Sequence, residues 1–472
     1  MKIFDYFETI SSIPRGSGHE QAISDYMVDF AKQLNLEVIQ DSANNVYIYK
    51  PGTKGYENSK PVILQGHLDI VWEKDKDTDF NFETQGLELY KDGDWIAAKG
   101  TTLGADNGVA IAYQMAILAD NTLEHPPLEI FMTTEEETGM GGVRNMHGEY
   151  LKGRTLINLD TDYEGEFLVS CAGGVRVRIN MALSAEQIGT TAAYNMKIHN
   201  LRGGHSGAEI HHERANANVI MGRVLKILNS KLSIGIACVN GGTKDNVITR
   251  ECDAIITVDA NKDNELKQLI AQLDAMLKSE YSAQDPDITI ELTPTTTNTI
   301  INRECVNKML NLITLLPNGV IGMSHHIENL VETSLNMGIV DTTDKNLHIT
   351  FAIRSSVETK KHEMVSKIMD LCEIIGAHCE AAEDYPAWTY KEHSPLREVA
   401  IKVYEKMYDK EPVIMAIHAG LECGFISQKL PQVDIISLGP NVKDIHSPQE
   451  RVSISSMTRV YEYLLELLKA LN

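Results

Sequence analysis

The sequence contains no cysteine pair of the CxxC type and no long apolar run. Its seven cysteines are odd in number and scattered, which is typical of a reducing compartment and excludes a disulfide framework and a thiolate zinc site. No stretch of about 18 apolar residues could cross a bilayer, and the first ten residues, MKIFDYFETI, lack the basic and apolar regions of a signal peptide. We therefore expect a cytoplasmic protein in which any metal ligands are carboxylates and imidazoles.

Basic residues are also far fewer than acidic residues. The chain has 66 acidic and 43 basic residues, which give a formal net charge of -23. This surplus of carboxylates argues against nucleic acid or an anionic membrane surface as a partner, and it suits the binding of cations. With 472 residues and 43% hydrophobic content, the chain is long enough for two domains or one large one, with hydrophobic cores.

Strands and helices alternate in the first part of the chain. Residues 1–35 have the apolar spacing of helices, and a further helix is expected at Val109–Leu118 after a Gly/Asp-rich loop. Short β-type runs occur at Leu36–Ile39, Val46–Tyr49, Pro61–Leu64 and Leu128–Thr133. This order predicts an α/β domain with a mostly parallel sheet, in which ligands bind beyond the C-terminal ends of the strands.

The pattern changes after about residue 187, where two similar segments follow one another. Residues 252–294, from CDAIITVDA to DITIELTP, have the pattern of strand, helix and strand, and residues 346–388, from NLHITFAIRSS to HCEAAEDYPAW, repeat it. We interpret this as an internal duplication within an α+β insert. Helix and strand patterns then resume, so we expect a discontinuous first domain, 1–187 and 388–472, interrupted by a second domain, 188–387, with two similar halves.

Three ionisable side chains that could take part in catalysis or metal binding lie after the first strands. In PVILQGHLDIV, alternation puts His67 and Asp69 on one face, so the carboxylate can hold one ring nitrogen while the other binds a metal. A purely structural His–Asp pair is the alternative. In GTTLGADNGVAIA, Asp106 lies in a glycine-flanked turn before a helix, where an N-cap is the alternative.

Further candidates follow the later strands. Glu135, Glu136 and Glu137 fall at the end of the apolar run that begins at Leu128, and solvated surface glutamates are the alternative there. Asp160 ends the apolar run in TLINLD, and His446 follows a strand and a Gly-Pro turn. Single acids and histidines at strand ends are common, but five such sites in one α/β domain are not.

The combination of two histidines and several carboxylates, without thiols, suits zinc, or manganese or cobalt, and is too rich in nitrogen for calcium. If one carboxylate bridges, each of two metals has an imidazole, the shared carboxylate and a terminal carboxylate. A water between two such cations loses a proton near neutral pH and attacks a polarised carbonyl. A carboxylate that does not bind metal must then carry the proton to the leaving amine. Adjacent glutamates can therefore supply one ligand and one base.

Seven motifs in order closely resemble those of the di-zinc peptidases that include aminoacylase, carboxypeptidase G and carnosinase: GHLDIV, GTTLGADNGVAIA, TTEEETG, LINLD, LRGGHSGAEIHHERANAN, HAGLECG and IHSPQE. The resemblance covers nearly the whole chain and implies a zinc-peptidase α/β domain interrupted by a lid domain. It implies that His67, Asp106 and Asp160 hold one zinc ion. By the same resemblance Asp106, Glu137 and His446 hold the other, so that Asp106 bridges the two.

The resemblance also implies roles for residues that do not bind metal. Asp69 would orient His67, and Glu136 would be the general base. Glu135 stands where relatives more often have Asp, and we treat it as a supporting residue. Adjacent glutamates are thus not equivalent in this interpretation.

The remaining candidates lie in the insert and in the last part of the chain. The resemblance implies that His205 stabilises the substrate oxyanion, with a surface histidine as the alternative, and that Asn246 and Arg354 hold the substrate backbone and its carboxylate. Arginine suits a carboxylate because its fork donates two hydrogen bonds, although a salt bridge to a neighbouring acid is the alternative. His418 and Glu422 are candidate substrate-binding residues without a clear chemical role; Glu422 could receive a substrate ammonium group or belong to a packed turn.

Together with this resemblance, these observations predict a metallodipeptidase of broad specificity, Xaa-His dipeptides included, that acts on unblocked dipeptides with two zinc ions. An enzyme with the same machinery that hydrolyses N-acyl amino acids is the nearest alternative. A non-catalytic peptide-binding protein is the second, but it would need no base beside Glu137. We expect small peptides as partners, no nucleic acid or membrane, and a monomer or a homodimer.

Overall fold

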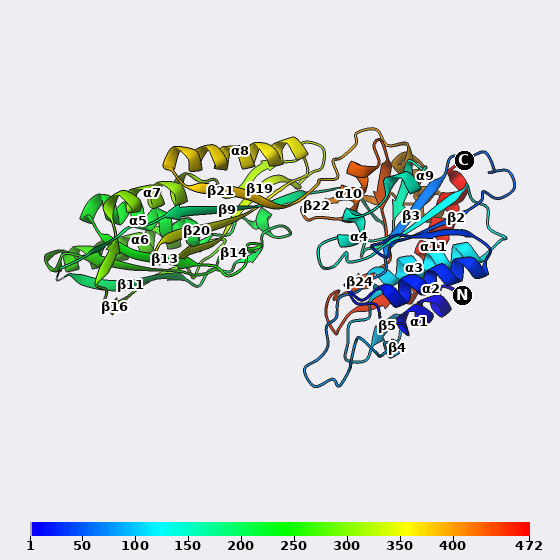
Figure 1. Cartoon of the computed structure of the whole chain (residues 1–472), viewed down its shortest axis with the longest axis horizontal. Coiled ribbons are helices and arrows are strands. Elements are labelled where there is room, and N and C mark those ends of the chain that lie inside the picture. The colour runs from blue at the N-terminus through cyan, green and yellow to red at the C-terminus, as the bar shows by residue number, and fades with distance from the viewer. Residues whose placement is uncertain (1, 190) are drawn as a thin grey trace. The chain divides into compact units, whose positions relative to one another are not determined.

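The computed structural model describes residues 2–189 and 191–472. Over these residues the chain divides into two compact units, and Figure 1 shows how the chain runs through them. Unit 1 comprises the chain up to Ser170 together with Tyr390–Ala416 and Leu421–Asn472, and unit 2 comprises Cys171–Thr389 together with Ile417–Gly420. No helix among the described residues is long and apolar enough to cross a membrane.

The division differs in two places from the expected one. The first boundary lies after Ser170 and not near residue 187, because β9 (Gly173–Ala182) pairs along its whole length with β20 (Asn346–Ser355). The short stretch Ile417–Gly420 also belongs to unit 2, although the chain around it belongs to unit 1. Sequence pattern identifies a strand, but only pairing assigns it to a domain.

The main sheet of unit 1 has a parallel centre. Its strands are, in spatial order, β1 (Glu37–Gln40), β2 (Val46–Lys50), β6 (Leu128–Thr133), β3 (Val62–His67), β7 (Thr155–Asn158), β23 (Asp434–Ser437), β8 (Glu166–Cys171) and β22 (Val413–Ile417). β6, β3, β7 and β23 are parallel neighbours, whereas β1, β2 and β8 pair antiparallel. The expected mostly parallel sheet is thus confirmed at the centre, where the C-terminal ends of four strands meet at one edge.

Helices flank this sheet (Figure 1). They are α1 (Lys2–Ser11), α2 (Gln21–Gln33), α3 (Ala105–Ala119), α4 (Gly141–Arg144), α9 (Pro395–Tyr408), α10 (Glu422–Lys429) and α11 (Ile454–Ala470). α3 is apolar on nearly every side and packs on β3 in a single core with α1, α9 and α11. Such a helix is buried on all faces, which fixes its first turn at the C-terminal edge of the sheet.

A second, small sheet in unit 1 was not expected from the sequence. Its order is β24 (Val442–Lys443), β25 (Arg451–Ser453), β5 (Trp95–Ala98) and β4 (Leu89–Asp92). The strands are two to four residues long, too short for a periodic pattern. The pairing of β25 with β5 fixes the segment around His446 to the loop before α3.

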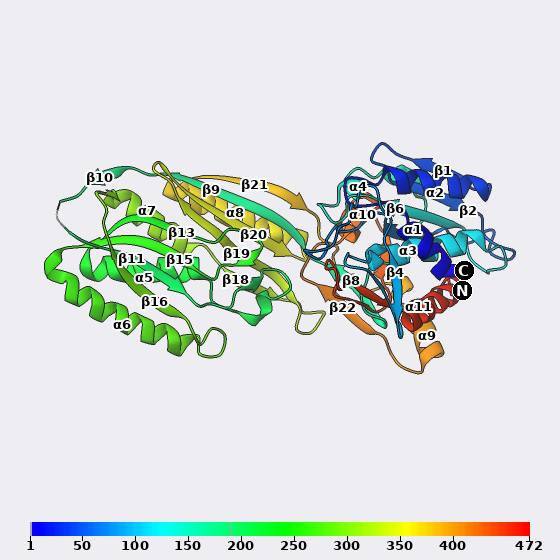
Figure 2. The same ribbon diagram turned by 90° about the horizontal axis from the view of Figure 1, so that it is seen from below.

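Unit 2 is built around one long antiparallel sheet, whose strands are seen side by side in Figure 2. In spatial order they are β16 (Thr289–Thr295), β11 (Ala192–His199), β15 (Cys252–Val258), β13 (Gly235–Gly241), β19 (Val331–Thr342), β20, β9 and β21 (His378–Tyr385), with β18 (Gly319–Met323) paired to β19. Two further pairs join β10 (Ala185–Gln187) to β17 (Thr299–Ile301) and β12 (Gly204–His205) to β14 (Val247–Ile248).

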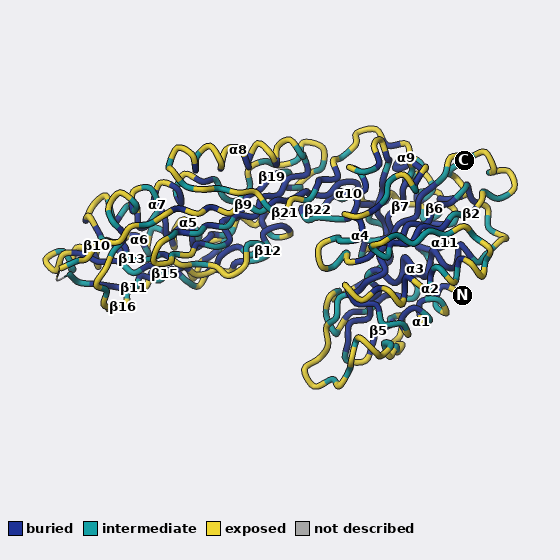
Figure 3. Tube along the Cα trace, in the orientation of Figure 1, coloured by how far each residue is buried: buried dark blue, intermediate teal, exposed yellow. Residues whose placement is uncertain are grey.

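The helices of unit 2 lie on one face of its sheet. They are α5 (Ala217–Leu232), α6 (Asp263–Glu280), α7 (Arg303–Leu315) and α8 (Glu358–Ile375). α5 contacts α6 and α7, and α7 contacts α8, so all four share a face, and the inward side chains of the strands form one core beneath them. Figure 3 shows the buried chain gathered along the strands of each unit.

The two halves of unit 2 share the same order of elements. One half runs β11, α5, β13, β15, α6, β16, and the other runs β9, α7, β19, β20, α8, β21, with the first half inserted between β9 and α7. The two halves meet where β13 lies beside β19. From there outward, the strands of each half follow in the order second, third, first and fourth, numbered along the chain within that half. This order is what a duplication would produce, and the duplication itself stays a prediction.

Candidate metal centre

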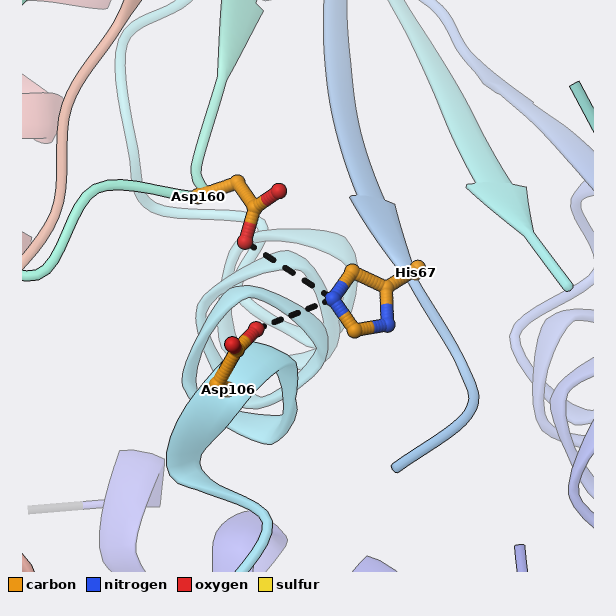
Figure 4. Close-up of side chains that lie close together, drawn as sticks. All are labelled: His67, Asp106 and Asp160. Atoms are coloured by element: carbon orange, nitrogen blue, oxygen red, sulfur yellow. Dashed lines mark hydrogen bonds and ion pairs between the residues drawn. The ribbon is translucent and has the colours of Figure 1, made fainter. Parts of the chain in front are cut away.

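Three ligand-type residues meet at the C-terminal edge of the parallel strands of unit 1 (Figure 4). His67 is the last residue of β3, Asp106 lies in the first turn of α3, and Asp160 follows β7. The His67 Nε2 atom lies 3.0 Å from Asp106 Oδ1 and 3.7 Å from Asp160 Oδ1. One ring nitrogen therefore points at two carboxylates, as a shared metal ion would require.

A second group shares Asp106 with the first. The His446 Nε2 atom lies 3.3 Å from Asp106 Oδ2 and 3.0 Å from Glu137 Oε2. In each group the ligand atoms of all three residues lie within 4.8 Å of one another. The two oxygens of Asp106 thus face different histidines, which is the geometry of a bridging carboxylate.

The structure does not support the N-cap alternative for Asp106. Gly104 occupies the N-cap position of α3, and no side chain caps the helix there. Asp106 itself has non-helical backbone angles, φ -78 and ψ 103, inside the first turn. Its side chain turns away from the helix amides toward the two histidines.

Asp69 connects the histidine to the glutamates. The His67 Nδ1 atom lies 3.0 Å from the Asp69 carbonyl oxygen and 3.3 Å from its Oδ1, which leaves Nε2 for the centre. Asp69 also accepts the backbone N–H groups of Glu136 at 3.1 Å and Glu137 at 3.2 Å, and the hydroxyl of Ser17 at 2.7 Å. The fully buried carboxylate therefore fixes both the imidazole and the glutamate turn.

The three adjacent glutamates have different environments. Glu135 is exposed and its backbone N–H donates to Glu20. Glu137 belongs to the group around His446, while Glu136 forms a further close group with His67 and Glu137. Glu136 is thus near the centre without belonging to either group that contains Asp106.

The centre is strongly negative. Burial raises the pKa of the Glu136 carboxyl well above its ordinary value, and the charges of Asp160, Glu422 and Glu137 add to this. Burial and the charge of Asp106 likewise raise the pKa of Asp160. Hydrogen bonds to Asp106 and Glu137 raise the pKa of His446 to about 11. Carboxylates that repel one another in a buried site are stabilised by cations.

The residues present fit two divalent ions. The donors are imidazole nitrogens and carboxylate oxygens, which suit zinc, cobalt or manganese. The Glu137 Oε1 atom is buried and has no hydrogen-bond partner, although buried polar atoms are nearly always paired. A metal ion beside Glu137 would satisfy that oxygen and offset the repulsion among the carboxylates.

Asn107 orients two of the proposed ligands and was not predicted from the sequence. The Asn107 side chain donates to Asp160 Oδ1 at 2.9 Å and to the Leu159 carbonyl at 2.7 Å, and its Oδ1 accepts the backbone N–H of His67. It therefore aligns a carboxylate and a histidine at once. Its position directly after Asp106 was the available signal, but an amide beside an acid is too common to single out.

His205 lies in unit 2, at the end of the short strand β12. Its Nδ1 atom accepts the backbone N–H groups of Gly207 at 3.2 Å and Ala208 at 3.0 Å. Burial and the charges of Arg354 and Arg176 lower its pKa. The imidazole is therefore neutral with its proton on Nε2, which makes Nε2 a hydrogen-bond donor.

Other predicted substrate-binding residues of unit 2 gather near His205. Arg354 is buried and its Nη1 donates to the Tyr385 hydroxyl at 2.7 Å; none of the ion pairs found within residues 2–189 and 191–472 includes it. A Cβ atom on Gly207 would lie within 3.1 Å of His205, Arg354 and the His418 carbonyl. Asn246 directly precedes Val247, which pairs with His205.

His418 and Glu422 are both buried, in different units. His418 Nε2 lies 2.7 Å from the Ser334 hydroxyl, and burial and Arg354 lower the pKa of His418 to about 3. Glu422 accepts hydrogen bonds from Gln65 at 2.6 Å and Thr133 at 2.7 Å, and burial raises its pKa to about 8. Glu422 is 0% exposed and its Oε1 atom has no hydrogen-bond partner, so its contact with a substrate ammonium group stays a prediction.

Comparison with known proteins identifies the family to which the chain and its fold belong. The model of the peptidase family M20/M25/M40 matches residues 63–470. The chain is 38% identical over 469 residues to the cytosol non-specific dipeptidase of Escherichia coli (strain K12), which covers 99% of this chain and 97% of that protein. The sequence motifs point within the family to aminoacyl-histidine dipeptidase, also called peptidase D, and this likeness is confirmed in structure.

The crystal structure of aminoacylhistidine dipeptidase from Vibrio alginolyticus superposes with a TM-score of 0.95 at 35% identity, covering 99% of this chain and 96% of that one. Aminopeptidase PepT from Bacillus cereus ATCC 10987 shares the fold, with a TM-score of 0.57, 14% identity and coverage of 100% and 98% of the two chains. Family model, sequence identity and structure agree over almost the full length. The chain therefore belongs to the peptidase family M20/M25/M40.

Proposed function

We propose that this chain is a metallodipeptidase that hydrolyses unblocked dipeptides, Xaa-His dipeptides included, with two zinc ions. The observation that carries the proposal is the position of Glu136, a carboxylate close to His67 and Glu137 that belongs to neither group containing Asp106. A binding protein would need only the ligands, whereas a hydrolase also needs a base. The substrate class is supported by the names of the two similar proteins, a non-specific dipeptidase and an aminoacylhistidine dipeptidase.

The proposed ligands are the two groups of the centre. His67, Asp106 and Asp160 would hold one ion, and Asp106, Glu137 and His446 the other. When bound, two such ions polarise a peptide carbonyl and lower the pKa of a water molecule. Zinc is proposed from the donor set, and cobalt or manganese could take its place.

Glu136 would move the proton. It removes a proton from the attacking water while the water oxygen bonds to the carbonyl carbon, and it delivers that proton to the amine nitrogen as the C–N bond breaks. Two amino acids are the products. Asp69 keeps this carboxylate in place through the backbone N–H of Glu136, at 3.1 Å.

Unit 2 would supply the contacts to the substrate. The Nε2–H of His205 is the proposed donor to the carbonyl oxygen as negative charge develops on it. Arg354 is proposed to bind the free carboxylate, because its Nε is buried without a partner and a guanidinium fork matches a carboxylate. Asn246 would hold the substrate backbone, and His418 would position the neighbouring strand through Ser334 at 2.7 Å.

Compartment and assembly complete the proposal. The Escherichia coli relative is named a cytosol enzyme, and we propose the cytoplasm for this chain as well. We propose a monomer or a homodimer. The two halves of unit 2 form one continuous sheet within a single chain, so a second chain is not needed to complete that sheet.

A panel of dipeptides tests the function directly. The purified protein is treated with a chelator, resupplied with zinc, and assayed on dipeptides, on the same peptides with an acetylated amine, and on tripeptides. We expect cleavage of free dipeptides only, with no turnover before zinc is restored.

Other results of the same panel would point elsewhere. Rapid cleavage of the acetylated peptides would favour an enzyme that acts on N-acylated substrates, and comparable rates on tripeptides would remove the dipeptidase assignment. Tight binding of dipeptides without any cleavage would favour the non-catalytic alternative.

A further inference from the structure

Glu450 holds the loop that carries Asp106. Its carboxylate accepts backbone N–H groups from Leu103 at 2.9 Å, Gly104 at 2.9 Å, Ala105 at 2.8 Å and Asp106 at 3.3 Å. The side chain is 2% exposed. Four amides from consecutive residues converge on one carboxylate, which is a charge-assisted arrangement about twice as strong per bond as neutral pairs.

Arg15 holds the same loop from its carbonyl side. This arginine is 1% exposed, and it donates through Nη2 to the Gly104 carbonyl at 2.7 Å and through Nη1 to the Leu68 carbonyl at 3.0 Å. Leu68 stands between His67 and Asp69, so the fork of Arg15 ties the histidine segment to the Asp106 loop. Two different nitrogens of the guanidinium reach the two carbonyls, a spread geometry that the single nitrogen of an ammonium group does not reproduce.

The two charged residues converge on Gly104. Its N–H donates to Glu450 and its carbonyl accepts from Arg15. Gly104 has φ +67, in the left-handed region, and a Cβ atom there would lie 2.9 Å from Arg15 Nη2. Glycine at this position lets both partners approach the backbone two residues before Asp106.

We propose that Arg15 and Glu450 are positioning residues of the metal centre, which set the place where Asp106 presents its two oxygens. The inference rests on the proposed two-metal function. Neither residue is a ligand, and within the described part of the chain Glu450 belongs to no group of side chains close enough to hold an ion. Arg15 connects Asp106 to the segment of His67, and Glu450 connects it to the segment of His446, four residues earlier in the chain.

If Arg15 and Glu450 served stability alone, they would act like any other buried charged residue that binds backbone groups at the end of a helix or strand. Lys50 and Glu129 of unit 1 are two such residues and serve for comparison. At the other end of α3, the buried Lys50 donates to the carbonyls of Ile117 at 2.7 Å, Leu118 at 3.1 Å and Asp120 at 2.8 Å. At the start of β6, the buried Glu129 accepts the N–H groups of residues 152 and 153 at 2.9–3.0 Å. Both are far along their elements from the edge that carries the ligands.

The test compares Glu450→Gln and Arg15→Lys with the control variants Glu129→Gln and Lys50→Met. Each full-length protein is stripped with a chelator and titrated with Co²⁺, which is followed by visible absorption and by equilibrium dialysis. We expect both positioning variants to bind Co²⁺ about 10–100-fold more weakly, with a changed absorption spectrum, as is typical when a partner of a metal ligand is removed. The controls should unfold at lower temperature but keep the wild-type affinity and spectrum.

The outcomes separate this inference from the proposed function. Wild-type affinity and spectrum in Glu450→Gln and Arg15→Lys would overturn the positioning role, as would an equal loss of affinity in the controls. If the wild-type protein itself fails to take up two Co²⁺ ions, the two-metal function is wrong instead. Should Glu450→Gln not fold, Glu450→Asp keeps the charge but is too short for all four amides, and we expect the same weakening from it.

Discussion

The backbone N–H of Glu136 donates to Asp69 Oδ1 at 3.1 Å, so the proposed base is held by the residue that also contacts the imidazole of His67. The other carboxylate oxygen of Asp69 accepts the N–H of Glu137 at 3.2 Å. One buried carboxylate therefore fixes a histidine and two glutamates of different proposed function. This contact explains how adjacent glutamates can face different partners.

Replacing Asp69 tests that connection. In Asp69→Asn an amide nitrogen replaces one acceptor oxygen and faces a donor, which disturbs the glutamate turn or the imidazole. We expect zinc affinity to fall by about 10–100-fold and turnover to fall with it. Zinc titration of the chelated variant measures this, and unchanged affinity together with unchanged turnover would show that Asp69 is dispensable.

Asp106 should matter to both ions. Removing a shared carboxylate leaves two cations with less negative charge between them, so Asp106→Ala should lose affinity at both sites. Metal analysis after equilibrium dialysis against dilute zinc counts the ions retained. Two zinc ions at wild-type affinity would be incompatible with a bridging carboxylate.

His205 should affect turnover and not metal binding. Loss of a donor to the developing oxyanion typically costs about 10²–10³-fold in kcat, so His205→Ala should show this loss with full zinc content. His211→Ala, which removes an exposed histidine of a neighbouring turn, is the matched control. Near-normal kcat in His205→Ala would remove the proposed oxyanion role.

His418 predicts a pH dependence of the stability of unit 2. Burial and Arg354 lower its pKa from the usual 6.5 to about 3, so between these values the unfolded chain binds a proton that the folded chain does not. Stability is therefore full above pH 6.5 and falls as the pH drops, by up to about 1.4 kcal/mol per pH unit.

His418→Gln removes this titration and keeps a hydrogen-bonding group near Ser334. Both proteins carry Trp72→Phe and Trp95→Phe, so that the fluorescence reports Trp388 of unit 2. Urea unfolding at pH 7.5 and 5.5 should then show a smaller loss of stability in the variant than in the protein that keeps His418. Equal losses in the two proteins would mean that His418 is not the titrating group.

The meeting of His67, Asp106 and Asp160 could be predicted from the sequence. Each follows or ends an apolar run or begins a helix, and the C-terminal ends of parallel strands meet at one edge. The imidazole and carboxylate donors of these side chains then indicate a metal ion such as zinc, cobalt or manganese. The same reasoning reaches His446 only as a strand-end histidine, since its left-handed backbone, φ 59, and its contact with Glu137 depend on long-range packing.

Arg15 and Glu450 could not be found in this way. Charged residues in a sequence are expected at the surface, and hydrogen bonds to distant backbone groups leave no periodic pattern. The burial of Glu422 against Gln65 and Thr133 was not predicted for the same reason. The first domain boundary was misplaced because β9 has the pattern of a strand in either unit.

The central claim is that neighbouring glutamates divide ligand and base between them, and two variants test it most directly. Zinc content and kcat are measured for Glu136→Gln and Glu137→Gln on a dipeptide substrate. The account predicts two retained zinc ions and a loss of about 10²–10⁴-fold in kcat for Glu136→Gln, and weakened zinc binding, by about 10–100-fold, for Glu137→Gln. A Glu136→Gln protein that loses a zinc ion, or that keeps wild-type kcat, would contradict it.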